Sequence, residues 1–168
     1  MNIYLREMGS LTLLSHDEEL KLAEMMEEGK FKVQNAVLST PLAMPVLQTL
    51  IADLQSGKRK IFQTVHGIPD NQLTIINREL KLFFKLGKKA EELDRQREQL
   101  LKEIREIDFR SERYDELRSD ALEIGAQIAA IFSDKLICQE CVNSVATGIE
   151  ELSKRFRHVL VEMVKERK

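Results

Sequence analysis

The sequence predicts an all-α protein in which short N-terminal helices are followed by an antiparallel bundle of three long helices. The first observation is that apolar residues recur every three or four positions over most of the chain, which is the period of an amphipathic helix. The second is that 168 residues contain only seven glycines and three prolines, too few for the closely spaced turns of a sheet protein. Because 43% of the residues are hydrophobic, the helices are expected to pack around an ordinary core.

Residues 1–56 are expected to form the first part of the chain. Ser15 lies three residues before Glu18, which is typical of a capping box in which a hydroxyl and a carboxylate each bond a backbone amide at a helix start. A helix is therefore expected to begin directly after Ser15 and to stop before Pro41, since the residue preceding a proline disfavours helix. A second helix is expected over 42–54, with its leucines and Ile on one face.

Residues 57–71 are expected to be a joint, because two glycines, a proline and an Asp-Asn pair interrupt the helical pattern. This segment also holds Lys58, Arg59 and Lys60, the only dense basic cluster before the long helices. One interpretation is a solvated loop. The alternative is that the cluster contacts duplex phosphate or an acidic face of a protein partner.

Residues 72–168 are expected to form the three long helices. The first is expected over 73–107, the second over 114–132 and the third from Cys138 to Met163. Their connections are only a few residues long, which favours antiparallel neighbours. The first helix is longer than the second, and we expect the third helix and the 42–54 segment to cover the remainder. Phe156 belongs to the apolar stripe of the third helix. It is either a core anchor of the bundle or part of an exposed face that is available to a partner.

No group of residues in the sequence predicts catalysis. The three histidines are isolated, no serine or cysteine stands in a nucleophile motif, and no glycine-rich phosphate loop occurs. The 26 basic and 28 acidic residues nearly cancel, so any contact with nucleic acid would have to be local. The chain is therefore expected to be a binding protein, with no enzymatic activity and no cofactor.

Cys138 and Cys141 form a Cys-x-x-Cys motif with no second pair and no histidine at ligand spacing. We therefore expect no metal site and no disulfide framework, and we interpret the two residues as buried thiols rather than redox or metal-binding groups, under assumed reducing conditions. The sequence shows no signal peptide and no apolar run of membrane-spanning length. A cytoplasmic protein without membrane contact is expected.

The first residues carry the most specific pattern in the chain. It comprises a Tyr-Leu-Arg-Glu-Met-Gly run, a Leu-Leu-Ser, an acidic run that opens a helix, and a Glu-Gly stop. This pattern resembles region 1.2 of the primary, housekeeping sigma factors of bacterial RNA polymerase. The long helices then stand where such factors carry a helical insertion, the so-called non-conserved region, before region 2.1. The residues that carry the resemblance are Tyr4, Leu5, Arg6, Glu7, Met8, Gly9, Leu13, Leu14, Ser15, His16, Asp17, Glu18, Glu19, Leu22, Ala23, Glu27, Glu28 and Gly29.

The resemblance implies a function that the composition does not reveal. Primary sigma factors bind core RNA polymerase and direct promoter-specific transcription initiation. Their region 1.2 contacts the nontemplate strand of the promoter discriminator, and their insertion contacts the largest catalytic subunit of the polymerase. By resemblance, the DNA-binding positions are Tyr4, Leu5, Arg6, Met8 and Gly9.

The residue types at these positions are compatible with single-strand binding. Arg6 can pair with a phosphate or a base edge, and Tyr4 and Met8 can lie against an unstacked base. The alternative is that Tyr4, Leu5 and Met8 dock a short helix, expected over 3–8, onto a core.

Several parts of a whole sigma factor are absent from the sequence, including the strand-opening aromatic helix, region 2.1 and a C-terminal helix-turn-helix. The chain is therefore expected to be a monomeric fragment of such a factor. One alternative is an autonomous helical adaptor or coiled-coil scaffold, whose apolar stripes pack with a partner helix. Another is a regulator that mimics region 1.2.

Overall fold

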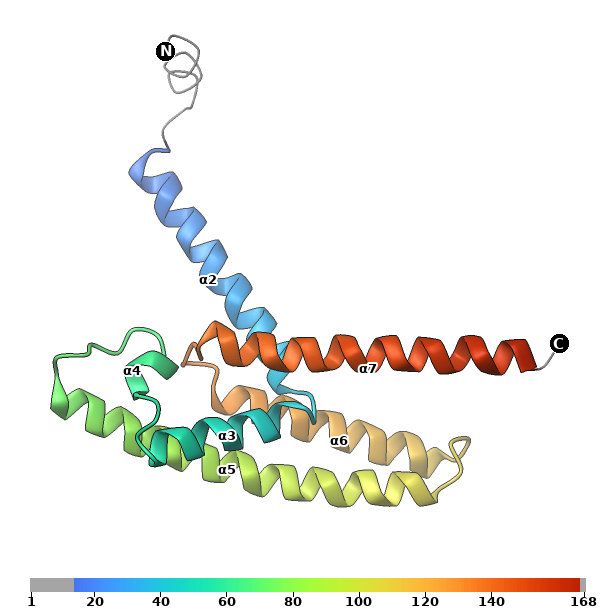
Figure 1. Ribbon diagram of the computed structural model, residues 1–168. Helices are drawn as coiled ribbons and strands as arrows, with labels where there is room; N and C mark the ends of the chain where they lie inside the picture. The colour runs from blue at the N-terminus through green and yellow to red at the C-terminus, as the bar shows by residue number, and fades with distance from the viewer. Residues whose placement is uncertain (1–13, 167–168) are drawn as a thin grey trace, which may run out of the picture. The chain divides into compact units, whose positions relative to one another are not determined.

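The computed structural model describes residues 14–166, and it confirms the all-α prediction for them (Figure 1). The only β-type pairing in this range is an isolated bridge between Val65 and Ile137. The chain divides into two compact units, Met1–Lys32 and Val33–Lys168. The six helices in the described range are α2 His16–Leu38, α3 Ala43–Gln55, α4 Ile61–Thr64, α5 Leu73–Glu106, α6 Glu112–Ile131 and α7 Gln139–Glu166.

Helix α2 begins with the predicted capping box. The backbone N–H of Ser15 donates to Glu18 Oε2 at 2.8 Å, and the N–H of Glu18 donates to Ser15 Oγ at 3.4 Å. The helix ends at Leu38, before Pro41. Both expected limits of this helix are therefore confirmed, because both depend on residues close to them in the sequence.

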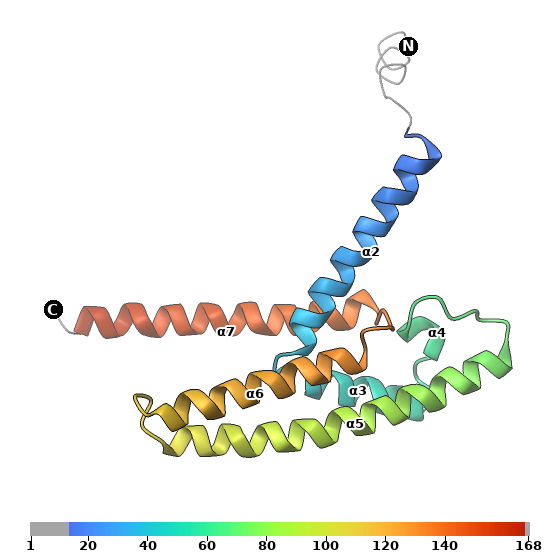
Figure 2. The ribbon, with the colours of Figure 1, turned by 180° about the vertical axis from the view of Figure 1, so that it is seen from behind.

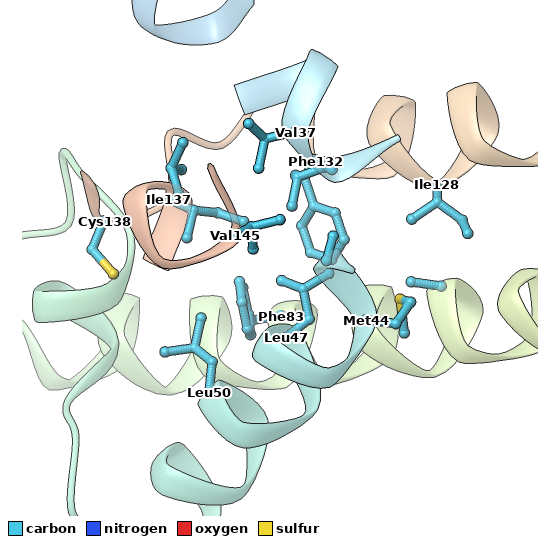
Figure 3. Packing of buried hydrophobic residues seen from close by; sticks show 14 of the residues in the cluster. Val37, Met44, Leu47, Leu50, Phe83, Ile128, Phe132, Ile137, Cys138 and Val145 are labelled. Carbon is cyan, nitrogen blue, oxygen red and sulfur yellow. The ribbon is translucent and has the colours of Figure 1, made fainter. Parts of the chain in front are cut away.

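The hydrophobic core of the second unit lies where α3, α5, the end of α6 and the start of α7 meet (Figure 3). The rings of Phe83 from α5 and Phe132 after α6 are fully buried, and their centroids lie 5.8 Å apart in a tilted arrangement. Met44, Leu47 and Leu50 of α3 are also buried there. Burial of each such side chain contributes about 1.5–3 kcal/mol.

Helices α5 and α6 form an antiparallel pair, as Figures 1 and 2 show. Helix α6 begins where the Oγ of Ser111 accepts a hydrogen bond from the backbone N–H of Tyr114 at 3.2 Å. Helix α3 packs on α5 beside Gly87, where a Cβ would collide with the end of the Ile51 side chain. The expected cover of α5 by the 42–54 segment is therefore present, and α4 adds to it.

Gln34, at the end of α2, is fully buried and joins that helix to the α6–α7 connection. Its Nε2 donates to the carbonyls of Phe132, at 3.2 Å, and Lys135, at 2.8 Å. Its Oε1 accepts from the N–H of Ile137 at 2.7 Å. The Gln34 side chain thus provides hydrogen-bond partners for three backbone groups of a buried connection. Without such partners, burying these backbone groups away from water would cost free energy.

Arg97, which interrupts the apolar stripe of α5 in the sequence, is also buried, with 2% of its side chain exposed. Its Nε donates to Asp94 Oδ1 at 3.1 Å, and its Nη1 donates to the carbonyl of Ser39 at 3.0 Å. The charge is therefore paired and hydrogen-bonded, as a buried charge must be. Gly125 of α6 lies directly beside this group, because a Cβ there would collide with the Ser39 carbonyl oxygen.

The segment predicted to be a joint, 57–71, contains α4 and contributes Ile61, Thr64 and Val65 to the buried interior. Two turns within it use glycines with positive φ, +74° at Gly57 and +81° at Gly67, a backbone region that disfavours other residues. The domain division predicted at this segment, with parts 1–56 and 72–168 on either side, stays a prediction.

The predicted bundle of three long helices is not confirmed. The first part of α7 packs on α3 through buried residues such as Val142 and Val145, but its later apolar residues are exposed. Of the two alternatives for Phe156, the structure supports the exposed face, because 68% of this residue is exposed. The physical reason is length: at about 1.5 Å per residue, α7 extends roughly twice as far as the 13-residue α3 beneath it.

Replacing Phe156 by Ala is expected to lower the free energy of unfolding by less than ~1 kcal/mol, because its side chain already contacts water. The same truncation at the buried Phe83 should cost about 3–5 kcal/mol. Urea denaturation of both variants measures the difference. Equal losses would show that the later part of α7 is packed in solution.

Replacing Gly125 by Ala is expected to destabilise the chain by about 1–3 kcal/mol, because the added methyl meets the rigid Ser39 backbone beside Arg97. Gly148→Ala in α7 is the matched control. Its Cβ would make an ordinary contact, at 3.9 Å from Leu42 Cδ1, and alanine favours helix over glycine by about 1 kcal/mol. Thermal unfolding of the two variants should move in opposite directions, and a neutral Gly125→Ala would contradict the close approach.

Candidate functional site

The predicted DNA-contacting residues all lie outside the described part of the chain. They are Tyr4, Leu5, Arg6, Met8 and Gly9, and the structure describes residues from Leu14 onward. In the first unit, the described segment runs from Leu14 to Lys32 and consists mainly of the first turns of α2.

This segment of α2 carries both acidic and apolar exposed side chains. Three acids, Asp17, Glu18 and Glu19, occupy the first turn, where the positive end of the helix favours them. The hydrogen bonds from Ser15 hold the pKa of the Glu18 carboxyl below its ordinary value. The apolar side chains, between 48% and 68% exposed, are Leu14, Leu20, Leu22, Met25 and Met26.

The basic cluster of 58–60 is divided in the structure. Lys58 and Lys60 are exposed, whereas Arg59 is half-buried and engaged with the start of α7. Arg59 Nη2 pairs with Glu140 Oε2 at 2.8 Å. Its Nη1 donates to the sulfur of Cys138 at 3.4 Å. Two of the three cations are therefore available on the surface, and the third has partners within the protein.

Two cysteines complete this constellation at the N-terminal end of α7. The Sγ atoms of Cys138 and Cys141 lie 3.0 Å apart, and Arg59 Nη1 lies 4.0 Å from the Cys141 sulfur. The N–H of Cys138 donates to the carbonyl of Thr64 at 2.7 Å, which fixes the position of the first sulfur. Cys138 is buried and Cys141 is half-buried.

The two thiols differ in acidity. A hydrogen bond from the Cys141 thiol, together with the charge of Arg59, lowers the pKa of Cys138 to about 6, although burial opposes the shift. The same hydrogen bond and burial raise the pKa of Cys141. The two shifts have opposite directions, so Cys138 loses its proton more readily than Cys141.

The sequence interpretation missed the role of Arg59 in this site. It identified the motif of Cys138 and Cys141, but Arg59 lies 79 residues before Cys138 in the chain. No spacing or periodicity connects residues so far apart. In the fold, the bridge between Val65 and Ile137 and the ion pair of Arg59 with Glu140 hold the two segments together.

A pocket of about 330 Å³ lies beside the cysteines, between α3 and α7. Arg59, Glu140 and Cys141 contribute polar groups to it, and α3 contributes apolar residues together with Thr49 and Asp53. Its full lining is Pro45, Val46, Thr49, Leu50, Asp53, Arg59, Glu140, Cys141 and Ser144. The Cys141 side of the thiol pair is therefore open to small molecules.

The later part of α7 presents an exposed apolar stripe. Its members are between 47% and 68% exposed, and charged residues lie between them. An exposed patch of this kind is typical of a protein-binding surface. The stripe comprises Leu152, Phe156, Val159, Leu160, Met163 and Val164.

Two further properties concern residues 14–166 alone. No group of three or more His, Cys, Asp or Glu side chains in that range is arranged to hold a metal ion. No single helix there combines the length and apolar composition needed to cross a membrane, although α2 and α3 meet those criteria when counted together as a bent pair.

Residues 1–32 match the family model described as Sigma-70 factor, region 1.2. The match ends at Lys32, where the first compact unit also ends. The first unit therefore corresponds to a sigma-70-type region 1.2, and this supports the interpretation of the chain as part of a sigma factor. Sigma factors are non-enzymatic transcription initiation factors that work with core RNA polymerase and promoter DNA.

The lowered pKa of Cys138 makes stability depend on pH. The pKa of the Cys138 thiol is about 6 in the folded state and has its ordinary value of 9.0 in the unfolded state. Between pH 6 and pH 9, the unfolded state therefore binds more protons than the folded state. The free energy of unfolding should therefore rise from pH 6 to pH 9, and this contribution should be lost as pH falls through 6.

Urea unfolding of the reduced chain and of Cys138→Ala at pH 5.5 and pH 8.5 measures this contribution. The advantage of the unmodified chain over the variant should be larger at pH 8.5. Cys141→Ser is the control that keeps a hydrogen-bond donor beside Cys138. An advantage that is the same at both pH values would show that Cys138 stays protonated.

Proposed function

We propose that this chain is part of a primary sigma factor, which binds core RNA polymerase and directs promoter-specific transcription initiation. The observation that carries the proposal is the match of residues 1–32 to region 1.2, together with the coincidence of that match with a compact unit. A cytoplasmic location accompanies this function, because core polymerase acts there.

At the level of residues, region 1.2 would read the nontemplate strand of the discriminator through Tyr4, Leu5, Arg6, Met8 and Gly9. An arginine, an aromatic ring and a thioether are suited to a single strand, because bases that have left the duplex expose both phosphates and flat faces. Gly9 would let the backbone turn closely past the strand.

The second unit, from Val33 onward, would be the helical insertion that precedes region 2.1 and contacts the largest catalytic subunit of the polymerase. Two described surfaces support this role. The exposed apolar stripe of α7 offers contact area to a protein, and Lys58 and Lys60 offer exposed positive charge for an acidic face or a phosphate backbone. The unit would act as a binding module in a monomeric fragment.

The alternative function is that of an autonomous helical adaptor or coiled-coil scaffold. The observation that favours it is the same stripe of α7, whose apolar residues follow a helical period that a partner helix could cover. In that case the stripe, rather than the first unit, would carry the function.

Replacing both Arg6 and Met8 by Ala in the full-length factor is expected to shorten the lifetime of the open promoter complex. The affinity for core polymerase should stay nearly unchanged, because the contacts removed are to DNA. Open-complex lifetime on a linear promoter fragment and the dissociation constant for core polymerase are the two measurements.

The comparison variant replaces Lys58 and Lys60 by Ala, which removes two exposed cations of the second unit that are proposed to contact the polymerase or a phosphate backbone rather than the discriminator bases. It should leave the dependence of lifetime on discriminator sequence intact. Normal lifetimes combined with loss of core binding in the Arg6 and Met8 variant would overturn the assignment of these residues. If neither variant affects transcription initiation, the scaffold function is favoured.

A further inference from the structure

The thiol pair at the start of α7 has no role in the proposed function, yet its geometry is that of a reactive dithiol. The two sulfurs are 3.0 Å apart, and an arginine from a distant segment lies 3.4 Å from one of them. The first sulfur stands just before Gln139, the first residue of a 28-residue helix, where the positive end of the helix stabilises a negative charge.

We propose that Cys138 and Cys141 are a hydroperoxide-sensitive modification site: the Cys138 thiolate reacts with hydrogen peroxide, Cys141 resolves the product to an intrachain disulfide, and Arg59 positions the reacting sulfur.

The chemistry balances in two steps. The Cys138 thiolate attacks one peroxide oxygen, the O–O bond breaks, and the departing hydroxide takes up a proton to leave as water, so that Cys138 becomes a sulfenic acid. The sulfur of Cys141 then loses its proton and attacks the Cys138 sulfur. The S–O bond breaks and a second water leaves. Two thiols are oxidised to one disulfide, and one peroxide is reduced to two waters.

The surroundings of each sulfur suit its step. Cys138 carries the lowered pKa, and the charged groups that face it are Arg59, which stabilises the thiolate, and Glu140, which opposes it but is paired with Arg59. The Cys141 sulfur is hydrogen-bonded to the Cys138 sulfur at 3.0 Å, and this bond, together with burial, raises the pKa of Cys141. Once Cys138 is a neutral sulfenic acid, that hydrogen bond to a charge is lost and Cys141 becomes easier to deprotonate.

The pocket beside α7 gives a small oxidant access to the Cys141 side of the pair, and the two sulfurs lie within reach of one another. The 330 Å³ pocket between α3 and α7 has Cys141 and Arg59 in its wall, and it is far larger than a peroxide molecule. Bulky disulfide oxidants would be hindered, because Cys138 itself is buried. The sulfurs need to approach by only about 1 Å to reach the ~2.0 Å length of a disulfide bond.

Oxidation would also change the environment of Arg59. The disulfide is neutral, so Arg59 would lose its thiolate partner and retain only Glu140, an exposed carboxylate. The segment that joins α3 to α4 would then be held less firmly to the start of α7, since Arg59 links this segment to Cys138 and Glu140.

The test uses the reduced 168-residue chain and hydrogen peroxide at pH 6, with intact-mass measurement and alkylation of the remaining thiols. The expected product is one intrachain disulfide, reversible by dithiothreitol. At pH 6, a larger fraction of Cys138 is thiolate in the folded chain than in the same chain unfolded in urea. A thiolate with a lower pKa is also a weaker nucleophile, which offsets part of this advantage. The net expectation is that Cys138 reacts about tenfold faster in the folded chain.

Three variants and one control, Lys58→Gln, assign the roles, and each is first checked for native helicity. Cys141→Ser should stop at a sulfenic acid on Cys138, which dimedone traps. Arg59→Gln should slow the reaction several-fold and shift its pH profile to higher pH. Arg59→Lys should restore part of the rate. Lys58→Gln should change neither the rate nor the pH profile.

Two outcomes would overturn the proposal. One is reaction of the folded chain that is slower than that of the unfolded chain, which is the behaviour of an inert buried thiol. The other is a disulfide between two copies of the chain in place of an intrachain one.

Discussion

The position of α7 depends on one buried amide, the side chain of Gln34. Its three hydrogen bonds to Phe132, Lys135 and Ile137 fix the connection that precedes the helix. Because the backbone of Ile137 is held, the next residue, Cys138, can donate its N–H to Thr64 and place its sulfur against Arg59. The thiol pair, the pocket beside it and the direction in which α7 leaves the core all follow from this attachment.

Arg97 has a comparable role at the end of the core where α2 meets α5 and α6. Its guanidinium takes the place of an apolar residue in the stripe of α5, and it bonds both Asp94 and the carbonyl of Ser39. The neighbouring Gly125 gives the Ser39 backbone room to approach α6. A buried charge of this kind is tolerated only while every partner is in place, so it selects one packing of these helices over others.

The sequence predicted features that depend on neighbouring residues and missed those that depend on distant ones. The capping box of Ser15 and Glu18 marks the start of α2 because both partners lie within one turn. The stripe of α7 has the same period whether a helix covers it or not, so the pattern could not tell that Phe156 is exposed. The contact of Arg59 with the cysteines left no signal, since the residues share no element. The basic cluster and the Cys-x-x-Cys motif could both be recognised in the sequence. What the sequence did not show is that Arg59, a member of the basic cluster, contacts the two cysteines.

The hydrogen bond between Gln34 and Ile137 joins residues that are 103 positions apart. Closing a loop of that length costs chain entropy before any contact rewards it, whereas α5 and α6 adjoin in the sequence and can pair early. We therefore expect folding to begin with the α5–α6 hairpin and to end with the attachment of α2 to the α6–α7 connection. On a ribosome, this last step has to wait until Ile137 has left the exit tunnel, so the end of α2 stays without its partners for most of the synthesis of the chain.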